Sequence, residues 1–239
     1  MSIIFILIIG LAFFTQSLLG FGGGLICIPL LSLFMPVQDV VSMVMIYQFS
    51  MGLLLFKIHH HIKWPYLLKM LPTTVIGAVC GIYLLNHVDG DVMRGILAGY
   101  IILHLLRKHT WFDPLGWLIH KGDAHLAGFL GGTLNAMMGG GGPAFILYLK
   151  EKLPNSNEFR AGITTMLILS NVPRVIGTVG TGLLTYDLFI QALYAYPIFL
   201  CALVLGQKLH DKVPQKRFFI AVECLLVLSA CLLIAKILL

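Results

Sequence analysis

Apolar residues run through this chain in long stretches separated by short polar or charged turns. About 20 predominantly apolar residues are enough for a helix to cross the hydrocarbon core of a bilayer, and most of the stretches reach that length. The pattern therefore predicts an all-α polytopic membrane protein. The stretches cover residues 2–34, 38–56, 64–86, 92–106, 126–149, 160–182, 188–207 and 218–238.

Two of these stretches contain a cluster of glycines near the middle. The first cluster occupies residues 20–24 as Gly-Phe-Gly-Gly-Gly, and the second occupies residues 139–142 and is followed by Pro143. Glycine in a helix interior costs about 1 kcal/mol relative to alanine, so we expect each cluster to break its helix. Broken helices at membrane depth are tolerated where the exposed backbone is buried in protein or lines a cavity. We therefore predict that the two breaks form two walls of one binding site.

Residues around the clusters recur at constant spacing, which indicates an internal repeat. Gly10, Thr15 and Gly22 match Gly128, Thr133 and Gly140 at a shift of 118, and Pro72 and Gly81 match Pro197 and Gly206 at a shift of 125. We predict a first repeat over 1–108, an inter-repeat cytoplasmic loop over 109–124 and a second repeat over 125–239. Together they make one transmembrane domain.

Composition and charge define the topology that we expect. Hydrophobic residues make up 59% of the chain and charged residues 11%, against about 25% charged in soluble domains. If both glycine-bearing segments are re-entrant hairpins, 13 of the 16 Lys and Arg residues fall on one side, as the positive-inside rule requires. Each repeat is then one hairpin plus three transmembrane helices, the repeats are inverted, and both termini lie outside. The net charge of +6 reflects cytoplasmic loops, so no nucleic-acid partner is expected.

The half-helix after each glycine cluster is predicted to bind an anion. Its first N–H groups lack intrahelical partners and lie at the positive end of the helix dipole, and glycine lets a ligand approach this backbone. The alternative is that glycines permit close helix crossing, which is our interpretation of isolated glycines such as Gly77, Gly81, Gly99 and Gly206. The backbone groups predicted to bind substrate belong to Gly22, Gly23, Gly24, Gly140, Gly141 and Gly142.

Arg174 is the strongest single candidate for binding the anion. A charge in the middle of the 160–182 stretch is energetically costly, and such a charge faces a cavity or a partner. Its guanidinium suits bidentate binding of an oxyanion; the alternative is an ion pair with Glu223. Polar side chains near the breaks and mid-span are predicted to bond substrate oxygens, with interhelical bonds as the alternative. These residues are Asn135, Asn171, Gln48, Thr15, Ser17 and Thr133.

Other candidates are weaker. Glu223 is a candidate for proton or ion coupling, with a buried protonated acid as the alternative. His59, His60 and His61 lie between lysines at a span end, where an interfacial loop is favoured over the metal site of a metal-ion exporter. Neither glycine run is followed by the Lys and Ser/Thr of a nucleotide-binding loop, and no nucleophile or metal-ligand arrangement stands out. We predict no enzyme, no cofactor and no bound metal.

The glycine clusters, with Pro29, Asn135 and Pro143 at their spacing in a repeated architecture, resemble the TauE/SafE family of sulfite and organosulfonate transporters. Trp64, Pro72, Gly77 and Gly81 support the resemblance. It implies secondary transport of a small sulfur-containing anion (sulfite, thiosulfate or an organosulfonate) across the inner membrane of the cell. We expect alternating access, with the lipid bilayer and a coupling proton or ion as partners. An anion channel with the same pore and a homodimer stay open as alternatives.

Overall fold

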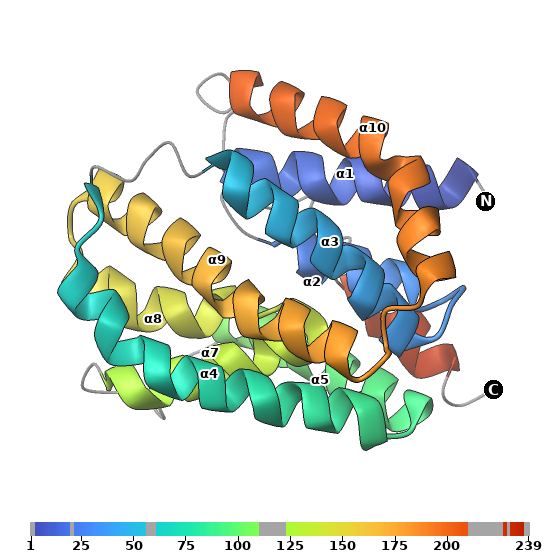
Figure 1. Cartoon of the computed structure of the whole chain (residues 1–239), viewed down its shortest axis with the longest axis horizontal. Coiled ribbons are helices and arrows are strands. Elements are labelled where there is room, and N and C mark those ends of the chain that lie inside the picture. Colours follow the sequence, from blue (N-terminus) through green and yellow to red (C-terminus); the bar gives the residue numbers. More distant parts are fainter. Residues whose placement is uncertain are drawn as a thin grey trace. The chain divides into compact units, whose positions relative to one another are not determined.

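The computed structural model describes residues 3–19, 22–55, 61–109, 123–209, 227–228 and 230–236, and in these ranges it contains helices and no strand (Figure 1). The all-α prediction is confirmed for this part of the chain. The helices are α1 (Ile3–Leu19), α2 (Gly23–Leu31), α3 (Val37–Leu55), α4 (Trp64–His87), α5 (Gly90–His109), α7 (Ala124–Met138), α8 (Gly142–Lys152), α9 (Ser156–Gly180) and α10 (Tyr186–Leu209).

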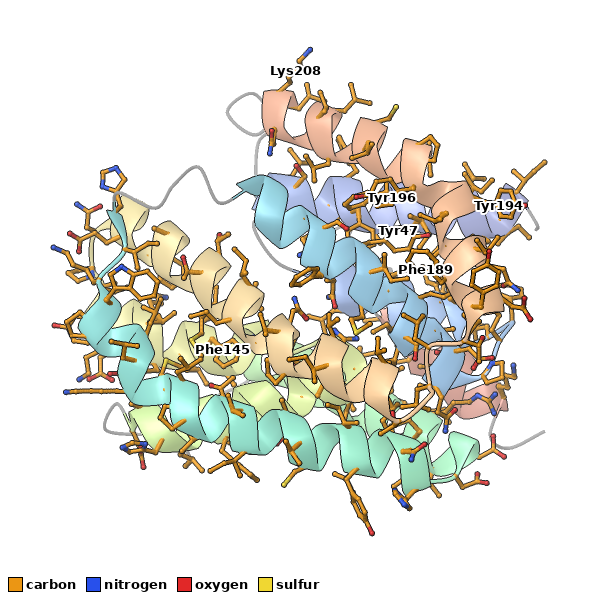
Figure 2. All side chains as sticks on the ribbon, in the orientation of Figure 1. Tyr47, Phe145, Phe189, Tyr194, Tyr196 and Lys208 are labelled. Atoms are coloured by element: carbon orange, nitrogen blue, oxygen red, sulfur yellow. The ribbon has the colours of Figure 1, made fainter. Side chains whose placement is uncertain are left out.

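Three of the described helices are long and apolar enough to cross a membrane: Trp64–His87, Ala161–Gly180 and Tyr186–Leu209. They coincide with three of the predicted spans. On α4, Val75, Val79 and Tyr83 expose apolar side chains along one face, and Tyr194 on α10 is 68% exposed (Figure 2). Soluble monomers rarely expose apolar faces of this extent, so these faces are suited to lipid.

Both glycine clusters interrupt the helix, as predicted. In the first stretch α1 ends at Leu19 and α2 begins at Gly23, and in the second α7 ends at Met138 and α8 begins at Gly142. Gly22 and Gly139 have φ values of 100° and 59°. Only glycine adopts this left-handed region without strain, which explains why the breaks fall at these residues.

The chain forms two compact units. The first unit takes in α1, α2, residues 37–44 of α3, α5 and α10, and the second takes in residues 45–55 of α3 together with α4, α7, α8 and α9. Each unit holds one glycine break. The units cut across the predicted repeats 1–108 and 125–239, and these repeats stay a prediction.

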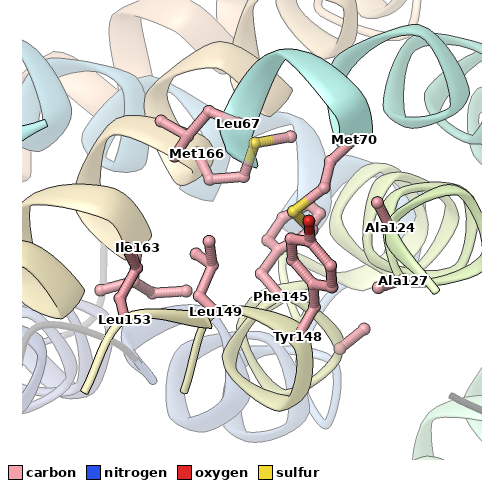
Figure 3. Packing of buried hydrophobic residues seen from close by; sticks show 11 residues of the cluster. Leu67, Met70, Ala124, Ala127, Phe145, Tyr148, Leu149, Leu153, Ile163 and Met166 are labelled. Atoms are coloured by element: carbon pink, nitrogen blue, oxygen red, sulfur yellow. The ribbon is translucent and has the colours of Figure 1, made fainter. Parts of the chain in front are cut away.

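In the second unit, α8 folds back along α7 after the glycine break. Ala124 and Ala127 at the start of α7 share a buried apolar cluster with Tyr148 and Leu149 near the end of α8 (Figure 3). If the chain continued in one direction, these pairs would be more than about 30 Å apart. Consequently α7 and α8 form a helical hairpin, the element that the glycine cluster and the charge pattern predict.

Small residues bring the helix before each glycine break against a long apolar helix. In the second unit, a Cβ built on Gly81 of α4 would lie 2.5 Å from the Thr133 carbonyl oxygen of α7, and a Cβ built on Gly77 would overlap the Phe129 carbonyl oxygen. In the first unit, a Cβ on Gly206 of α10 would lie 2.9 Å from the Phe14 carbonyl oxygen of α1. These glycines permit close helix crossing, as predicted. At Gly99, by contrast, no described atom lies within 4 Å of the Cβ position.

Candidate functional site

Arg174 is the largest side chain that is fully buried in the described part of the chain, with 0% exposure. It lies on α9, which continues through Pro173 without ending there. Ser170, Asn171 and Arg174 are spaced by one and three residues, so they share one face of the helix. This face is polar within an otherwise apolar span.

Two amide side chains hold the guanidinium in the second unit. Arg174 Nη1 donates to Gln48 Oε1 at 2.6 Å and to Asn171 Oδ1 at 3.4 Å. The other end of the Gln48 carboxamide donates from Nε2 to the Gly139 carbonyl oxygen at 3.2 Å. Gln48 on α3 therefore links the charged group on α9 to the glycine break after α7.

Asn135 connects α7 to the same face of α9. Its Nδ2 donates to Ser170 Oγ at 3.0 Å and to Asn171 Oδ1 at 3.1 Å, and Asn135 is 1% exposed. Four of the predicted site residues, Arg174, Asn135, Asn171 and Gln48, thus belong to one buried hydrogen-bond network. Two members of the network, Ser170 and the Gly139 carbonyl, were not among the predicted site residues. The position of Ser170 next to Asn171 could have identified it from the sequence. The contact between the Gly139 carbonyl and Gln48 depends on the tertiary fold.

The glycine run lies directly against this network. A Cβ on Gly141 would lie 2.7 Å from Asn135 Cβ and would also overlap the Gly131 carbonyl oxygen. Gly141 is the N-cap of α8, and no side chain caps it. The second unit therefore combines a guanidinium, which neutral amides orient, with an uncapped helix start, and the guanidinium and the helix start both favour an anion.

The first unit contains the other predicted glycines. Gly22 is the N-cap of α2, which has no side-chain cap, and Gly23 and Gly24 are buried in its first turn. That this cluster and residues 140–142 form two walls of one site stays a prediction.

The three predicted hydroxyl residues donate within the protein. Thr15 Oγ1 donates to the Leu11 carbonyl at 2.8 Å, and Thr133 Oγ1 donates to the Phe129 carbonyl at 2.9 Å. Ser17 Oγ donates to the Leu203 carbonyl of α10 at 2.7 Å. In this arrangement the hydroxyls offer a substrate only their acceptor lone pairs, and their predicted role as donors requires these bonds to break.

Two further candidates, Glu223 and the histidine tract, fall wholly or partly outside the described residues. Glu223, His59 and His60 lie there, while His61 is described and exposed. Among the described residues, no group of three or more His, Cys, Asp and Glu side chains could hold a metal ion. Coupling through Glu223 stays a prediction.

Comparison with known proteins gives a consistent result. The family model described as "Sulfite exporter TauE/SafE" matches residues 5–233. A curated relative, "Probable inner membrane transporter protein TsaS" of Comamonas testosteroni, is 26% identical over 174 residues, covering 70% of this chain and 71% of the relative. Another, "Probable sulfite/organosulfonate exporter TauE" of Cupriavidus necator, is 26% identical over 211 residues, covering 84% and 81%. No solved structure matches the chain.

Proposed function

Because the chain belongs to the sulfite exporter TauE/SafE family, we propose that it is a secondary transporter for a small sulfur-containing anion. The anion would be sulfite, thiosulfate or an organosulfonate, moved across the inner membrane by alternating access. The name of the relative from Cupriavidus necator includes sulfite and organosulfonate, and this supports the substrate class. We propose no enzymatic activity.

The observation that carries the proposal is the buried guanidinium beside the glycine break. An arginine at the middle of a span is costly, and such residues mark ion or substrate pathways. Gln48 and Asn171 orient Arg174 through amide oxygens, and these oxygens do not cancel its charge. The guanidinium therefore supplies a positive charge where the uncapped start of α8 also favours a negative one.

Substitution of Arg174 tests this proposal. Arg174→Gln removes the charge but keeps a donor for Gln48 Oε1, so the variant should fold. Hydrogen bonds to charged groups contribute about 1.5–3 kcal/mol, and we expect sulfite or sulfonate binding to weaken at least about tenfold. Binding is measured by isothermal titration calorimetry on purified protein.

The matched control is Lys69→Gln, which removes one positive charge from an exposed position on α4. It should bind the anion as the wild type does. If Arg174→Gln binds with unchanged affinity, Arg174 is not part of the site and the proposed geometry is wrong.

A further inference from the structure

The first unit contains a buried hydrogen-bond acceptor with no partner among the described residues. Gln16, near the end of α1, is 7% exposed, and its Oε1 makes no hydrogen bond within the described chain. Native structures leave few buried polar atoms in this state, and each one calls for an explanation. A packing role alone does not explain it, because an apolar side chain of similar size would fill the same volume.

This oxygen lies against the start of α2. A Cβ built on Gly23, the first residue of α2, would fall onto Gln16 Oε1 and lie 3.1 Å from Gln16 Cβ. The N-cap of α2 is Gly22, which offers no side-chain cap, and the Ile26 N–H donates to the Gly22 carbonyl oxygen at 3.2 Å. Donor N–H groups of the helix start and an unsatisfied acceptor therefore meet at one place, beside Gly23.

The second unit has an amide in the matching position. Gln16 precedes the N-cap Gly22 by six residues, and Asn135 precedes the N-cap Gly141 by six residues. Both amides pack against a glycine at the start of the returning half-helix. Asn135 belongs to the network around Arg174, so Gln16 occupies in the first unit the position that a site residue occupies in the second.

We propose that Gln16 and the N-terminal N–H groups of α2 bind a sulfur oxyanion that itself carries an O–H or N–H group. The anion's oxygens accept from the backbone N–H groups of α2, and its own donor satisfies Gln16 Oε1. Hydroxyl- or amino-substituted sulfonates and singly protonated sulfite belong to this class. The inference rests on the proposed function and adds a preference among its substrates.

A matched pair of sulfonates tests the preference. Hydroxyethanesulfonate and ethanesulfonate differ by one hydroxyl group, and both are titrated into the purified full-length chain by calorimetry. One hydrogen bond to a buried acceptor predicts that the wild type binds the hydroxylated compound about tenfold more tightly. Gln16→Leu should bind both compounds alike, near the wild-type affinity for ethanesulfonate.

Ser42→Ala is the control, because the Ser42 hydroxyl is buried in the same unit but donates to the Gln38 carbonyl of its own helix. It should keep the wild-type preference. Without ligand, Gln16→Leu should melt at the wild-type temperature or above, since it removes an unsatisfied buried acceptor.

Each other outcome overturns the inference. Equal affinity of the wild type for the two sulfonates overturns it, and so does a preference for the hydroxylated compound that Gln16→Leu retains. A lower melting temperature of Gln16→Leu also overturns it, because that result would assign Gln16 a structural role. Failure of the wild type to bind either sulfonate or sulfite overturns the proposed function as well, so the two failures are distinguishable.

Discussion

Gln48 orients the buried guanidinium of Arg174 without neutralising its charge. Its carboxamide has only one orientation that satisfies both Arg174 and the Gly139 carbonyl. Its Nε2 faces the Gly139 carbonyl and its Oε1 faces Arg174. The amide thereby fixes the position of the guanidinium relative to the glycine break and remains neutral itself. A carboxylate at this position would fit the same space but would neutralise Arg174.

The variant Gln48→Glu is therefore expected to lose anion binding. The new carboxylate pairs with Arg174 and can no longer donate to the Gly139 carbonyl. We expect affinity for sulfite or sulfonate to fall at least about tenfold, as measured by calorimetry. Gln38→Glu, at the start of α3 where Nε2 donates to the Val88 carbonyl, is the matched control and should bind normally. Equal binding by both variants would remove Gln48 from the site.

Sequence reasoning identified most of the network, since Arg174, Asn135, Asn171 and Gln48 are polar residues in apolar stretches, where each needs a partner. It did not give the partners. These depend on α3 and α7 packing against one face of α9, which is a property of the tertiary fold. The shift of 118 pairs Ser17 with Asn135, whereas the observed N-caps pair Gln16 with Asn135. The constant shift in the sequence therefore aligns Asn135 with the residue next to its structural counterpart, Gln16.

At the scale of elements, the helix breaks follow from local chemistry. Gly22 and Gly139 adopt positive φ, and Gly141 has no room for a side chain beside Asn135. A run of glycines is sufficient to predict the break. The glycines alone do not predict that α8 returns along α7; the charge pattern supplied that expectation, and the apolar cluster formed by Ala124, Tyr148 and their neighbours stabilises the return.

We predict that Gly141→Ala destabilises the protein. Its Cβ would overlap the Gly131 carbonyl and crowd Asn135, and overpacking of this kind costs about 1–3 kcal/mol. Gly99→Ala is the matched control on α5, where no described atom lies within 4 Å and alanine favours the helix by up to about 1 kcal/mol. Thermal unfolding in detergent should show a lower melting temperature for Gly141→Ala only. A Gly141→Ala variant as stable as the wild type would contradict the packing described for the hairpin.

At the scale of the whole molecule, each unit pairs the helix before a glycine break with a long helix from the other predicted repeat. α7 packs along α4 in the second unit, and α1 packs along α10 in the first. α4 and α10 each have 24 residues and an internal proline, and each packs a glycine, Gly81 or Gly206, against its partner helix, α7 or α1. With the predicted repeat boundaries, the two repeats would exchange their long helices; the repeats themselves stay a prediction.

Inverted repeats predict opposite orientations for α4 and α10. In a background without the five native cysteines, Thr185→Cys before α10 should react with a membrane-impermeant maleimide in intact cells. Lys63→Cys before α4 should react only after the membrane is permeabilised. Labelling of both positions from the same side would contradict the inverted arrangement and the outside location of the termini.

The central claim is that the chain transports a sulfur-containing anion through a site that includes Arg174. Its most direct test is the flux of radiolabelled sulfite into proteoliposomes, measured over a range of concentrations with wild-type protein and Arg174→Gln. We predict saturable uptake by the wild type, competition by sulfonates, and uptake near the protein-free background for the variant. Flux that rises without saturation, or equal uptake by the two proteins, would contradict this account.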